Sequence, residues 1–244
     1  MRRLAVIICS LLIILAAHAQ DASVLLPWVL AGASPSWTPL SLSPWAWYKA
    51  DGNAADASGN GRNGTFTTPI YTNGVNAQAF FFNGAGYVGT VTNRMAGALT
   101  VCFWLRLKSD YVSTQYIISD SSSWGGASTF GVQFGNTDKE FGFCQNNRVV
   151  SVSSVDLQDN NWHHIAVVRS GSAGAWTITW YFDGALDKAD NSAVNLAASG
   201  NGKITIGRVG DFNALHLKGD VDDMLIFTNA LTAPQVAQIY GWRQ

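Results

Sequence analysis

The sequence predicts an all-β protein, a two-sheet sandwich followed by one short C-terminal helix. A dozen or so short apolar segments succeed one another, separated by turns rich in Gly and Asn. The 244 residues include 24 glycines and ten tryptophans, and only 13% are charged. Because no unit of about 20–50 residues repeats, the pattern favours a sandwich over a solenoid or propeller.

The N-terminus has the pattern of a secretory signal. Arg2 and Arg3 precede an apolar run at 4–15, and Ala17-His18-Ala19 is a small-x-small cleavage site. We expect residues 1–19 to be removed and the protein to be secreted, extracellular or held in the cell envelope. A membrane anchor is the alternative, but an apolar run of 12 residues is short for a span of roughly 20. No membrane span is expected after cleavage.

Residues 20–44 are rich in Pro and Ser and carry scattered Trp and Leu. Proline limits helix formation, so we expect an extended linker or edge segment. It is apolar for a free linker, which suggests that it docks on the domain or on a partner. The domain itself is expected at 45–244.

The strands are expected in order along this domain. The clearest is 99–107, where Leu99, Val101, Phe103, Leu105 and Leu107 alternate and therefore share one face. Shorter apolar runs between turn residues predict the other strands before residue 160, at 46–50, 79–83, 87–91, 116–119, 129–134, 140–144 and 149–152.

The stretch 161–184 is the most informative. Strands are expected at 162–169 and 176–182, and the second ends in Asp183-Gly184, which supplies the positive φ of a tight hairpin. His163 and His164 are adjacent on a strand and point to opposite faces, so they cannot chelate one ion from the same side. Structural packing is the favoured interpretation of this pair.

Two more strands and a helix close the domain. Strands are expected at 203–208 and 221–227. Thr232 as N-cap and Pro234 in the first turn predict a helix at 233–240.

Five segments, in this order, resemble laminin-G-like domains of the concanavalin A-like lectin/glucanase superfamily. The resemblance implies an antiparallel jelly roll of concanavalin A-like type. The segments are the opening strand with its Asp-x-Ser-Gly-Asn-Gly turn (48–64), the Phe-Asn-Gly turn (82–84), the Phe-Trp strand (99–107), the hairpin (161–184) and the closing Asp-Asp strand (219–232).

Members of this family often bind one structural Ca²⁺. The resemblance implies Asp222 as the best-matched ligand, Asp51 as the N-terminal contributor, and Asp56 and Asn83 as weaker candidates. Ca²⁺ takes six to eight hard oxygen ligands, which Asp, Asn and turn carbonyls supply. Alternatively, Asp56 caps its own Asx-turn and Asp222 or Asp223 accepts backbone N–H groups.

Cys102 and Cys144 remain after signal cleavage, since Cys9 leaves with the signal. An even pair in an oxidising compartment favours a disulfide. The alternative is two buried free thiols, because both lie in apolar strands where Cys packs as a small hydrophobe.

Composition and motifs argue against two classes of function, nucleic-acid binding and catalysis. A net charge of −1 argues against nucleic acid, which needs a basic stripe. No Glu-x-Asp-x-x-Glu strand of the superfamily's glucanases is present, nor another catalytic motif, so an enzyme is not expected. Trp124, a large aromatic in a loop of small residues, could stack on a sugar or on its own loop.

The leading hypothesis is therefore a secreted, non-catalytic module that binds carbohydrate or a glycosylated surface. The alternative is a structural or adhesive component of an envelope, matrix or virion. A glycoside hydrolase is a third, less favoured hypothesis. The support is analogy at the level of the fold.

Overall fold

A computed structural model describes residues 37–92, 95–107, 113–120, 130–135, 140–146, 148–153, 155–194, 203–210 and 213–242. The chain divides into two units, Met1–Thr38 and Pro39–Gln244, and the strands of the described residues lie in the second. The predicted signal sequence and residues 20–36 lie outside the described residues.

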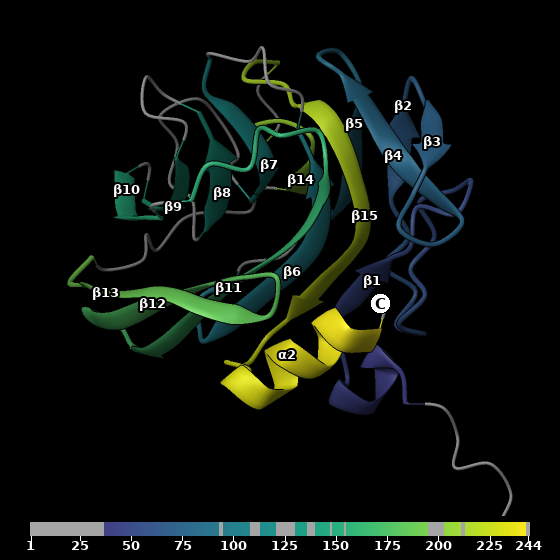
Figure 1. Ribbon diagram of the computed structural model, residues 1–244. Coiled ribbons are helices and arrows are strands. Elements are labelled where there is room, and N and C mark those ends of the chain that lie inside the picture. Colours follow the sequence, from purple (N-terminus) through teal and green to yellow (C-terminus); the bar gives the residue numbers. More distant parts are fainter. Residues whose placement is uncertain are drawn as a thin grey trace, which may run out of the picture. The chain divides into compact units, whose positions relative to one another are not determined.

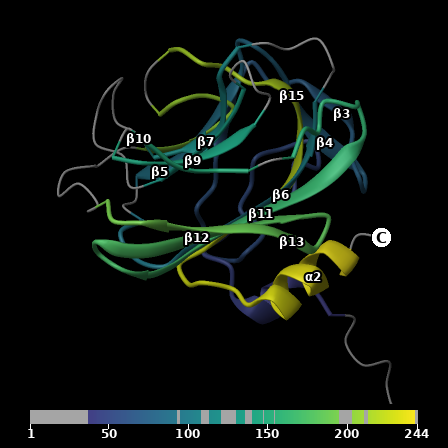
Figure 2. The ribbon, with the colours of Figure 1, turned by 60° about the vertical axis from the view of Figure 1, so that its left-hand side comes forward.

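Two antiparallel sheets form a sandwich in the second unit, which confirms the predicted fold class (Figures 1 and 2). In the described residues, sheet A has the order β13-β12-β11-β6-β15-β4-β3, and β1 pairs with β15 off this path. Its strands are β1 (Ala46–Tyr48), β3 (Tyr71–Asn73), β4 (Gln78–Asn83), β6 (Leu99–Arg106), β11 (Trp162–Ser172), β12 (Ala175–Phe182), β13 (Ala185–Ser192) and β15 (Lys218–Phe227).

Sheet B forms the other layer, in the order β10-β9-β8-β7-β14-β5-β2. In Figure 2 its strands β5, β7, β9 and β10 lie above β6, β11, β12 and β13 of sheet A, and the C-terminal helix lies below those strands of sheet A. Its strands are β2 (Thr65–Thr67), β5 (Tyr87–Thr92), β7 (Gln115–Ser119), β8 (Gly131–Phe134), β9 (Phe141–Gln145), β10 (Arg148–Val152) and β14 (Lys203–Ile206).

The apolar core lies between the sheets and follows the predicted alternation. Leu99, Val101, Phe103 and Leu105 of β6 are all in the core. Alternate residues of a strand point to opposite faces, so the residues between them, including Trp104 and Arg106, lie on the outer face of sheet A.

Helix α2 (Ala233–Trp242) covers part of that outer face (Figure 2). The Gln235 side chain accepts a hydrogen bond from the Thr232 backbone N–H at 2.8 Å, as the N3 residue of a capping box does. The Tyr240 ring lies 5.6 Å from Trp104 and 5.9 Å from His164, measured between centroids. The predicted helix is thus confirmed and extends two residues further.

Strands β2, β3 and β13 were not predicted from the sequence. Strand β13 is polar and mostly exposed, since it is an edge strand, and it carries no apolar alternation. Strands β2 and β3 have three residues each, too short for a period to show. A short 3₁₀ helix, η1 (Pro39–Leu42), stands where only extended chain was expected.

The expected disulfide is not formed, and this prediction is corrected. Cys102 and Cys144 are both free and buried. Cys102 is on β6 of sheet A and Cys144 on β9 of sheet B, and the core residues beside them, Phe103 and Phe143, point inward. Both thiols therefore face outward from opposite sheets, and packed sheets lie about 10 Å apart, beyond the Cα separation of about 7 Å that a disulfide permits. The even count of cysteines could not reveal this.

Candidate functional site

The outer face of sheet A is open beyond the row that α2 covers. The covered row contains Trp104 and His164, which are cross-strand neighbours on β6 and β11. The next outward row along the same strands contains Arg106 and Trp162, also neighbours. This second row borders an open hollow.

Strand register brings four side chains together in this second row. Phe81 on β4 is opposite Asp220 on β15, Asp220 is opposite Arg106 on β6, and Arg106 is opposite Trp162 on β11. Cross-strand neighbours on one face lie within side-chain contact. Sheet pairing alone thus brings together residues that are far apart in the sequence.

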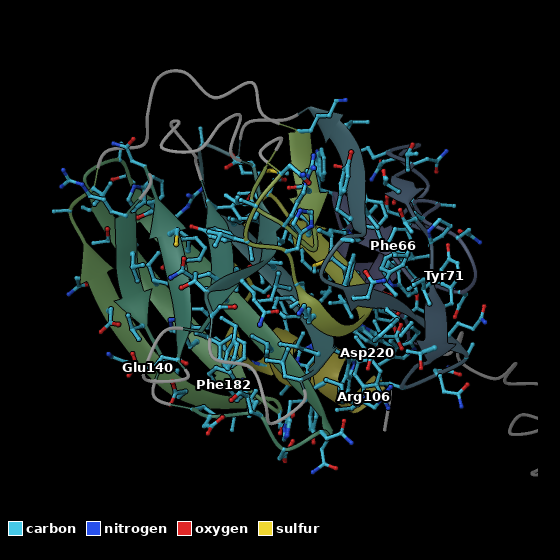
Figure 3. All side chains as sticks on the ribbon, turned by 90° about the horizontal axis from the view of Figure 1, so that it is seen from above. Phe66, Tyr71, Arg106, Glu140, Phe182 and Asp220 are labelled. Atoms are coloured by element: carbon cyan, nitrogen blue, oxygen red, sulfur yellow. The ribbon has the colours of Figure 1, made fainter. Side chains whose placement is uncertain are left out.

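Arg106 and Asp220 form an ion pair in this row (Figure 3). The Arg106 Nε donates to Asp220 Oδ2 at 2.8 Å, and the guanidinium carbon lies 4.8 Å from the centroid of the Trp162 ring. The Asp220 side chain is 7% exposed and that of Arg106 25% exposed. The guanidinium is therefore held from two sides while part of it still reaches solvent.

The hollow beside this pair has a volume of about 440 Å³ and is called the Arg106 hollow. Its lining residues are Tyr71, Thr72, Phe81, Arg106, Asn160 and Asp220. Figure 3 shows Tyr71 and Phe66 on the same side of the sandwich as Arg106 and Asp220. The Tyr71 ring packs on the core side against Phe66 and Phe80, at centroid distances of 5.8 and 6.1 Å, so Phe81 supplies the aromatic surface on the outer face of sheet A.

The Arg106 hollow combines available donors with aromatic surface. The terminal nitrogens of Arg106 donate no hydrogen bond to any residue in the described part of the chain. Asn160 supplies an exposed amide, while Asp220 holds Arg106 through its Oδ2. A concave site with apolar walls and a few convergent polar groups is the usual form of a small-molecule binding site.

Of the predicted calcium ligands, Asp222 and Asp51 approach one loop. Asp222 Oδ2 accepts the Val75 N–H at 2.8 Å, and Asp51 Oδ1 accepts the Gln78 N–H at 3.2 Å. Burial and the nearby Asp223 carboxyl raise the pKa of Asp222 to about 7. A cation beside Asp222 would offset the cost of its buried charge.

Asp56 is engaged in its own turn, as the alternative interpretation expected. Its Oδ1 accepts the N–H groups of Trp47 and Ser58, and its Oδ2 accepts that of Arg62, all at 2.9–3.0 Å. Burial acts to raise the pKa of Asp56, but these hydrogen bonds lower it overall. The carboxylate therefore organises the turn after β1.

Asn83 is not brought to Asp222. It lies at the end of β4, where its side chain accepts the Ala85 N–H, and it pairs with Lys218. Lys218 precedes Asp222 by four residues, which is about 13 Å along a strand. The four ligands implied by the resemblance thus do not form one cluster, and only Asp222 and Asp51 share a location.

These two carboxylates fit a calcium site only if backbone carbonyls, an Asn side chain or water complete it. The described residues contain no group of three or more His, Cys, Asp or Glu side chains that could hold a metal ion. Ca²⁺ accepts carbonyl and water oxygens, so a pair of carboxylates on one turn is compatible with it.

The two histidines face opposite sides of sheet A, as predicted. His163 is hydrogen-bonded to Asp183 at 2.8 Å and to Asp159 at 3.2 Å. Burial lowers the pKa of His163, but these two carboxylates raise it overall. His164 is buried between Trp104 and Tyr240. Both roles are structural.

Comparison with known proteins places the chain in a family. The model of the concanavalin A-like lectin/glucanases superfamily, of laminin G type, matches residues 82–237. The chain belongs to this superfamily. No curated protein sequence matches it.

Several solved structures share the fold of this laminin-G-like chain. One is domain 4 of an extracellular GH43 arabinanase from Geobacillus stearothermophilus, solved with arabinotriose; it has 16% identity and a TM-score of 0.64, over 81% of this chain and 98% of that one. Another is the receptor-binding domain of botulinum neurotoxin mosaic serotype C/D, with 14% identity and a TM-score of 0.61, over 82% of this chain.

The binding domain of Paraclostridial Mosquitocidal Protein 1 is similar at 13% identity and a TM-score of 0.64, over 82% of this chain. The chain spans about half the length of this domain and of the neurotoxin domain, with coverage of 52% and 50%. Identities this low show a shared fold alone. In the described residues, no helix is long and apolar enough to cross a membrane.

Trp124, for which the sequence left open a contact with a sugar or with its own loop, lies outside the described residues. Arg106, Asp220 and Tyr71 were not among the predicted site residues. The available signal was the outward position of Arg106 in the strongest predicted strand, because a charged residue there needs a partner or solvent. The partner itself depends on which strands pair.

Proposed function

We propose that this chain is a secreted, non-catalytic module that binds carbohydrate through the Arg106 hollow. The observation that carries the proposal is the Arg106–Asp220 pair beside aromatic rings, with terminal guanidinium nitrogens that donate to no other described residue. The ligand is either a free oligosaccharide or the glycan of a glycosylated surface.

The chemistry of a sugar matches this lining. A pyranose or furanose has an apolar C–H surface, which packs against aromatic side chains such as Phe81. It also has hydroxyl groups that both donate and accept. A buried hydroxyl without a partner costs about 1–3 kcal/mol, so a sugar site must supply both kinds of group. Arg106 donates, and the amide of Asn160 both donates and accepts.

The solved structures of similar fold support a binding role. The arabinanase domain is in complex with arabinotriose, and the neurotoxin domain is receptor-binding. The arabinanase is extracellular, in agreement with the signal pattern at 1–19, and we propose an extracellular or envelope location for this chain. Since one fold hosts many functions, the proposal depends on the chemistry of the Arg106 hollow.

Replacing Arg106 by alanine is expected to weaken glycan binding about 10- to 100-fold. A hydrogen bond from a charged donor contributes about 1.5–3 kcal/mol, and each 1.4 kcal/mol is about a factor of ten in Kd. Arg106→Lys is expected to bind almost as weakly, because an ammonium lacks the planar fork of the guanidinium. A glycan array on the mature protein would identify a ligand, and calorimetry would measure Kd for each variant.

Arg148→Ala is the matched control, since Arg148 is exposed on β10 of the other sheet. It should leave Kd unchanged. Equal melting temperatures would show that Arg106→Ala is folded. Absence of glycan binding in the wild type, with capture of a protein neighbour instead, would favour the structural or adhesive alternative. Release of reducing ends from a bound glycan would contradict the non-catalytic assignment.

We also propose that Asp222 and Asp51 hold a structural Ca²⁺ with nearby backbone oxygens. Such an ion would join the first and last strands of the domain. At free calcium about a hundred times its Kd, the free energy of unfolding should rise by about 2.7 kcal/mol. At roughly 2–4 °C for each kcal/mol, the melting temperature should rise by about 5–10 °C relative to chelator.

Two variants separate a calcium site from ordinary hydrogen bonding. Asp222→Asn should abolish the calcium-dependent rise. Asp56→Asn should lower stability with and without calcium but leave the rise intact, because Asp56 serves its own turn. Superimposable wild-type melting curves in calcium and in chelator would exclude the site.

A further inference from the structure

A second hollow lies at the end of the sandwich where β15 finishes. Its volume is about 460 Å³, within the range of about 300–1,000 Å³ that is usual for ligand sites. One wall is η1 with the residues that follow it, and the other is the turn after β1; in Figure 1, η1 is the purple turn below β1. This space is called the Arg62 hollow. Its lining includes Leu40, Ser43, Trp45, Asn60, Arg62 and Thr228.

Arg62 is held in the wall of this hollow by Trp45. The Arg62 Nη1 donates to the Trp45 carbonyl at 2.9 Å, and the guanidinium carbon lies 4.4 Å from the centroid of the Trp45 ring. The Arg62 carbonyl accepts a hydrogen bond from the Tyr48 hydroxyl at 2.7 Å, which fixes the backbone at the same place. Since the guanidinium is already ordered, binding a ligand there costs little further side-chain entropy.

Arg62 forms no ion pair in the described part of the chain, unlike Arg106, which is paired with Asp220. Asp56 belongs to the same turn, but its oxygens accept backbone N–H groups, among them that of Arg62 itself at 2.9 Å. No acidic side chain of the described residues lines the hollow. The Nε and Nη2 of the half-buried Arg62 donate no hydrogen bond to any described residue, so this edge of the guanidinium is available to an anion in the hollow.

The other polar groups of the hollow suit sugar hydroxyls. The Asn60 Nδ2 donates to the carbonyls of Pro44 and Trp45, at 3.0 and 3.1 Å. These contacts fix the orientation of the amide, and its Oδ1 accepts no hydrogen bond from any described residue. Ser43 and Thr228 are exposed, and their hydroxyls make no hydrogen bond within the part of the chain that the structure describes. A sugar hydroxyl both donates and accepts, so it can pair with each of these groups.

We propose that the Arg62 hollow binds an acidic saccharide, with the carboxylate of a uronic acid on the Nε–Nη2 edge of Arg62. That edge presents two parallel N–H groups, which match the two oxygens of a carboxylate. The hydroxyls of the same sugar bond to Asn60 Oδ1, Ser43 and Thr228. The proposal goes beyond the proposed function and shares with it only the class of ligand.

This site is separate from the Arg106 hollow. Asp220 lines that hollow and Thr228 lines the Arg62 hollow, and the two residues are eight positions apart, which is about 25 Å along a strand. Variants at sites this far apart have independent effects. A chain with both sites engages one polysaccharide at two points or joins two polysaccharide chains.

The test measures Kd on the mature protein for three ligands of equal length: trigalacturonate, its methyl ester and neutral galactotriose. Trigalacturonate should bind at least about tenfold more tightly than the other two, because a hydrogen bond to a charged group is worth about a factor of ten. The methyl ester keeps the carbonyl oxygens and loses the charge, so it should bind like galactotriose. The preference for the acid should shrink at high salt, since partly exposed charges are screened.

Arg62→Gln should remove the preference for the acid, because it deletes the charge. Arg148→Gln is the matched control, since Arg148 is exposed on β10 of sheet B, and it should change nothing. Arg106→Ala should leave the preference for the acid intact, which separates this site from the Arg106 hollow.

Changes at Leu40 test the role of charge without altering Arg62. The Leu40 side chain is 45% exposed and lines the hollow, so its replacement should leave the fold intact. Relative to Leu40→Gln, Leu40→Glu should weaken trigalacturonate binding by up to about fivefold, and Leu40→Lys should strengthen it by a similar factor. Galactotriose should bind all three variants equally.

Equal affinity of the wild type for the acid and the two neutral ligands, or no binding of any of them, would overturn the proposal. So would a preference for the acid that survives Arg62→Gln or that Arg106→Ala removes. If Arg62→Gln lowers the melting temperature, the Leu40 series decides, and an affinity for trigalacturonate that ignores the charge at position 40 excludes the site. The proposed function fails by a different result, namely neutral glycan binding that is absent or unchanged in Arg106→Ala.

Discussion

Replacing Arg169 by methionine is expected to lower the free energy of unfolding by about 3–5 kcal/mol, the usual cost of breaking a buried charged network. Arg169 is fully buried on β11. Its Nε donates to the Gly97 carbonyl at 3.0 Å, and an Nη donates to the carbonyls of Met95 and Gly97. The guanidinium also lies 5.0 Å from the Trp176 ring. Methionine keeps the aliphatic stem and removes only the donors and the charge.

The charge of Arg169 also interacts with a buried carboxylate. Burial lowers the pKa of Arg169 to about 10, while the charge of Asp120 opposes this shift. Asp120 is itself 1% exposed. Removing Arg169 therefore takes a cation away from a buried carboxylate and a donor away from two carbonyls.

Thermal and urea unfolding measure this effect. For a domain of this size, a loss of about 3–5 kcal/mol corresponds to a fall in melting temperature of roughly 6–20 °C. The free energy of unfolding of Arg148→Met, a change on the surface of β10, should stay within about 0.5 kcal/mol of the wild-type value. In a double-mutant cycle, Asp120→Asn should recover part of the loss caused by Arg169→Met. Strict additivity of the two changes would show that the charges are not coupled.

The strands that face the core could be predicted because burial leaves a period in the sequence. Strand β6 alternates over its whole length, and α2 has a cap and a proline in its first turn. Strand β13 could not be found in this way. Its residues are mostly exposed, so burial imposes no apolar pattern on them.

The candidate site could not be predicted because it depends on register. Arg106 and Asp220 belong to strands that were both expected, yet their pairing requires β6 and β15 to be neighbours at one particular offset. The same dependence on register explains why Asn83 was wrongly expected beside Asp222. The family pattern brought it into the calcium set, whereas the register places it opposite Lys218, away from Asp222.

Acidification is expected to destabilise the domain through His164. This residue is 1% exposed, and neither ring nitrogen has a hydrogen-bond partner among the described residues. Burial lowers the pKa of His164 to about 4, although the charge of Asp183 opposes the shift. A histidine in the unfolded chain has a pKa of about 6.5. Between about pH 6.5 and 4 the unfolded chain therefore binds a proton at this residue, whereas the folded chain does not.

The direction of the pH dependence depends on this difference in pKa. Above about pH 6.5 both states are neutral at His164, and no cost arises. As pH falls from about 6.5 to about 4, the unfolded state gains protons, and stability should drop by about 3 kcal/mol in total. Asp222 acts in the opposite direction, because its raised pKa favours the folded state as pH falls through about 7. The contribution of His164 must therefore be measured as a difference between variants.

His164→Phe is the variant that isolates the contribution of His164 to stability. Phenylalanine keeps a ring against Trp104 and Tyr240 and cannot take up a proton. The gap in unfolding free energy between this variant and wild type should grow in favour of the variant between about pH 6.5 and 4. His163→Gln is the matched control with the opposite sign. The pKa of His163 is raised, so its contribution is present at low pH and lost as pH rises through that pKa. Parallel pH profiles for wild type and His164→Phe would mean that the ring under α2 is already hydrated.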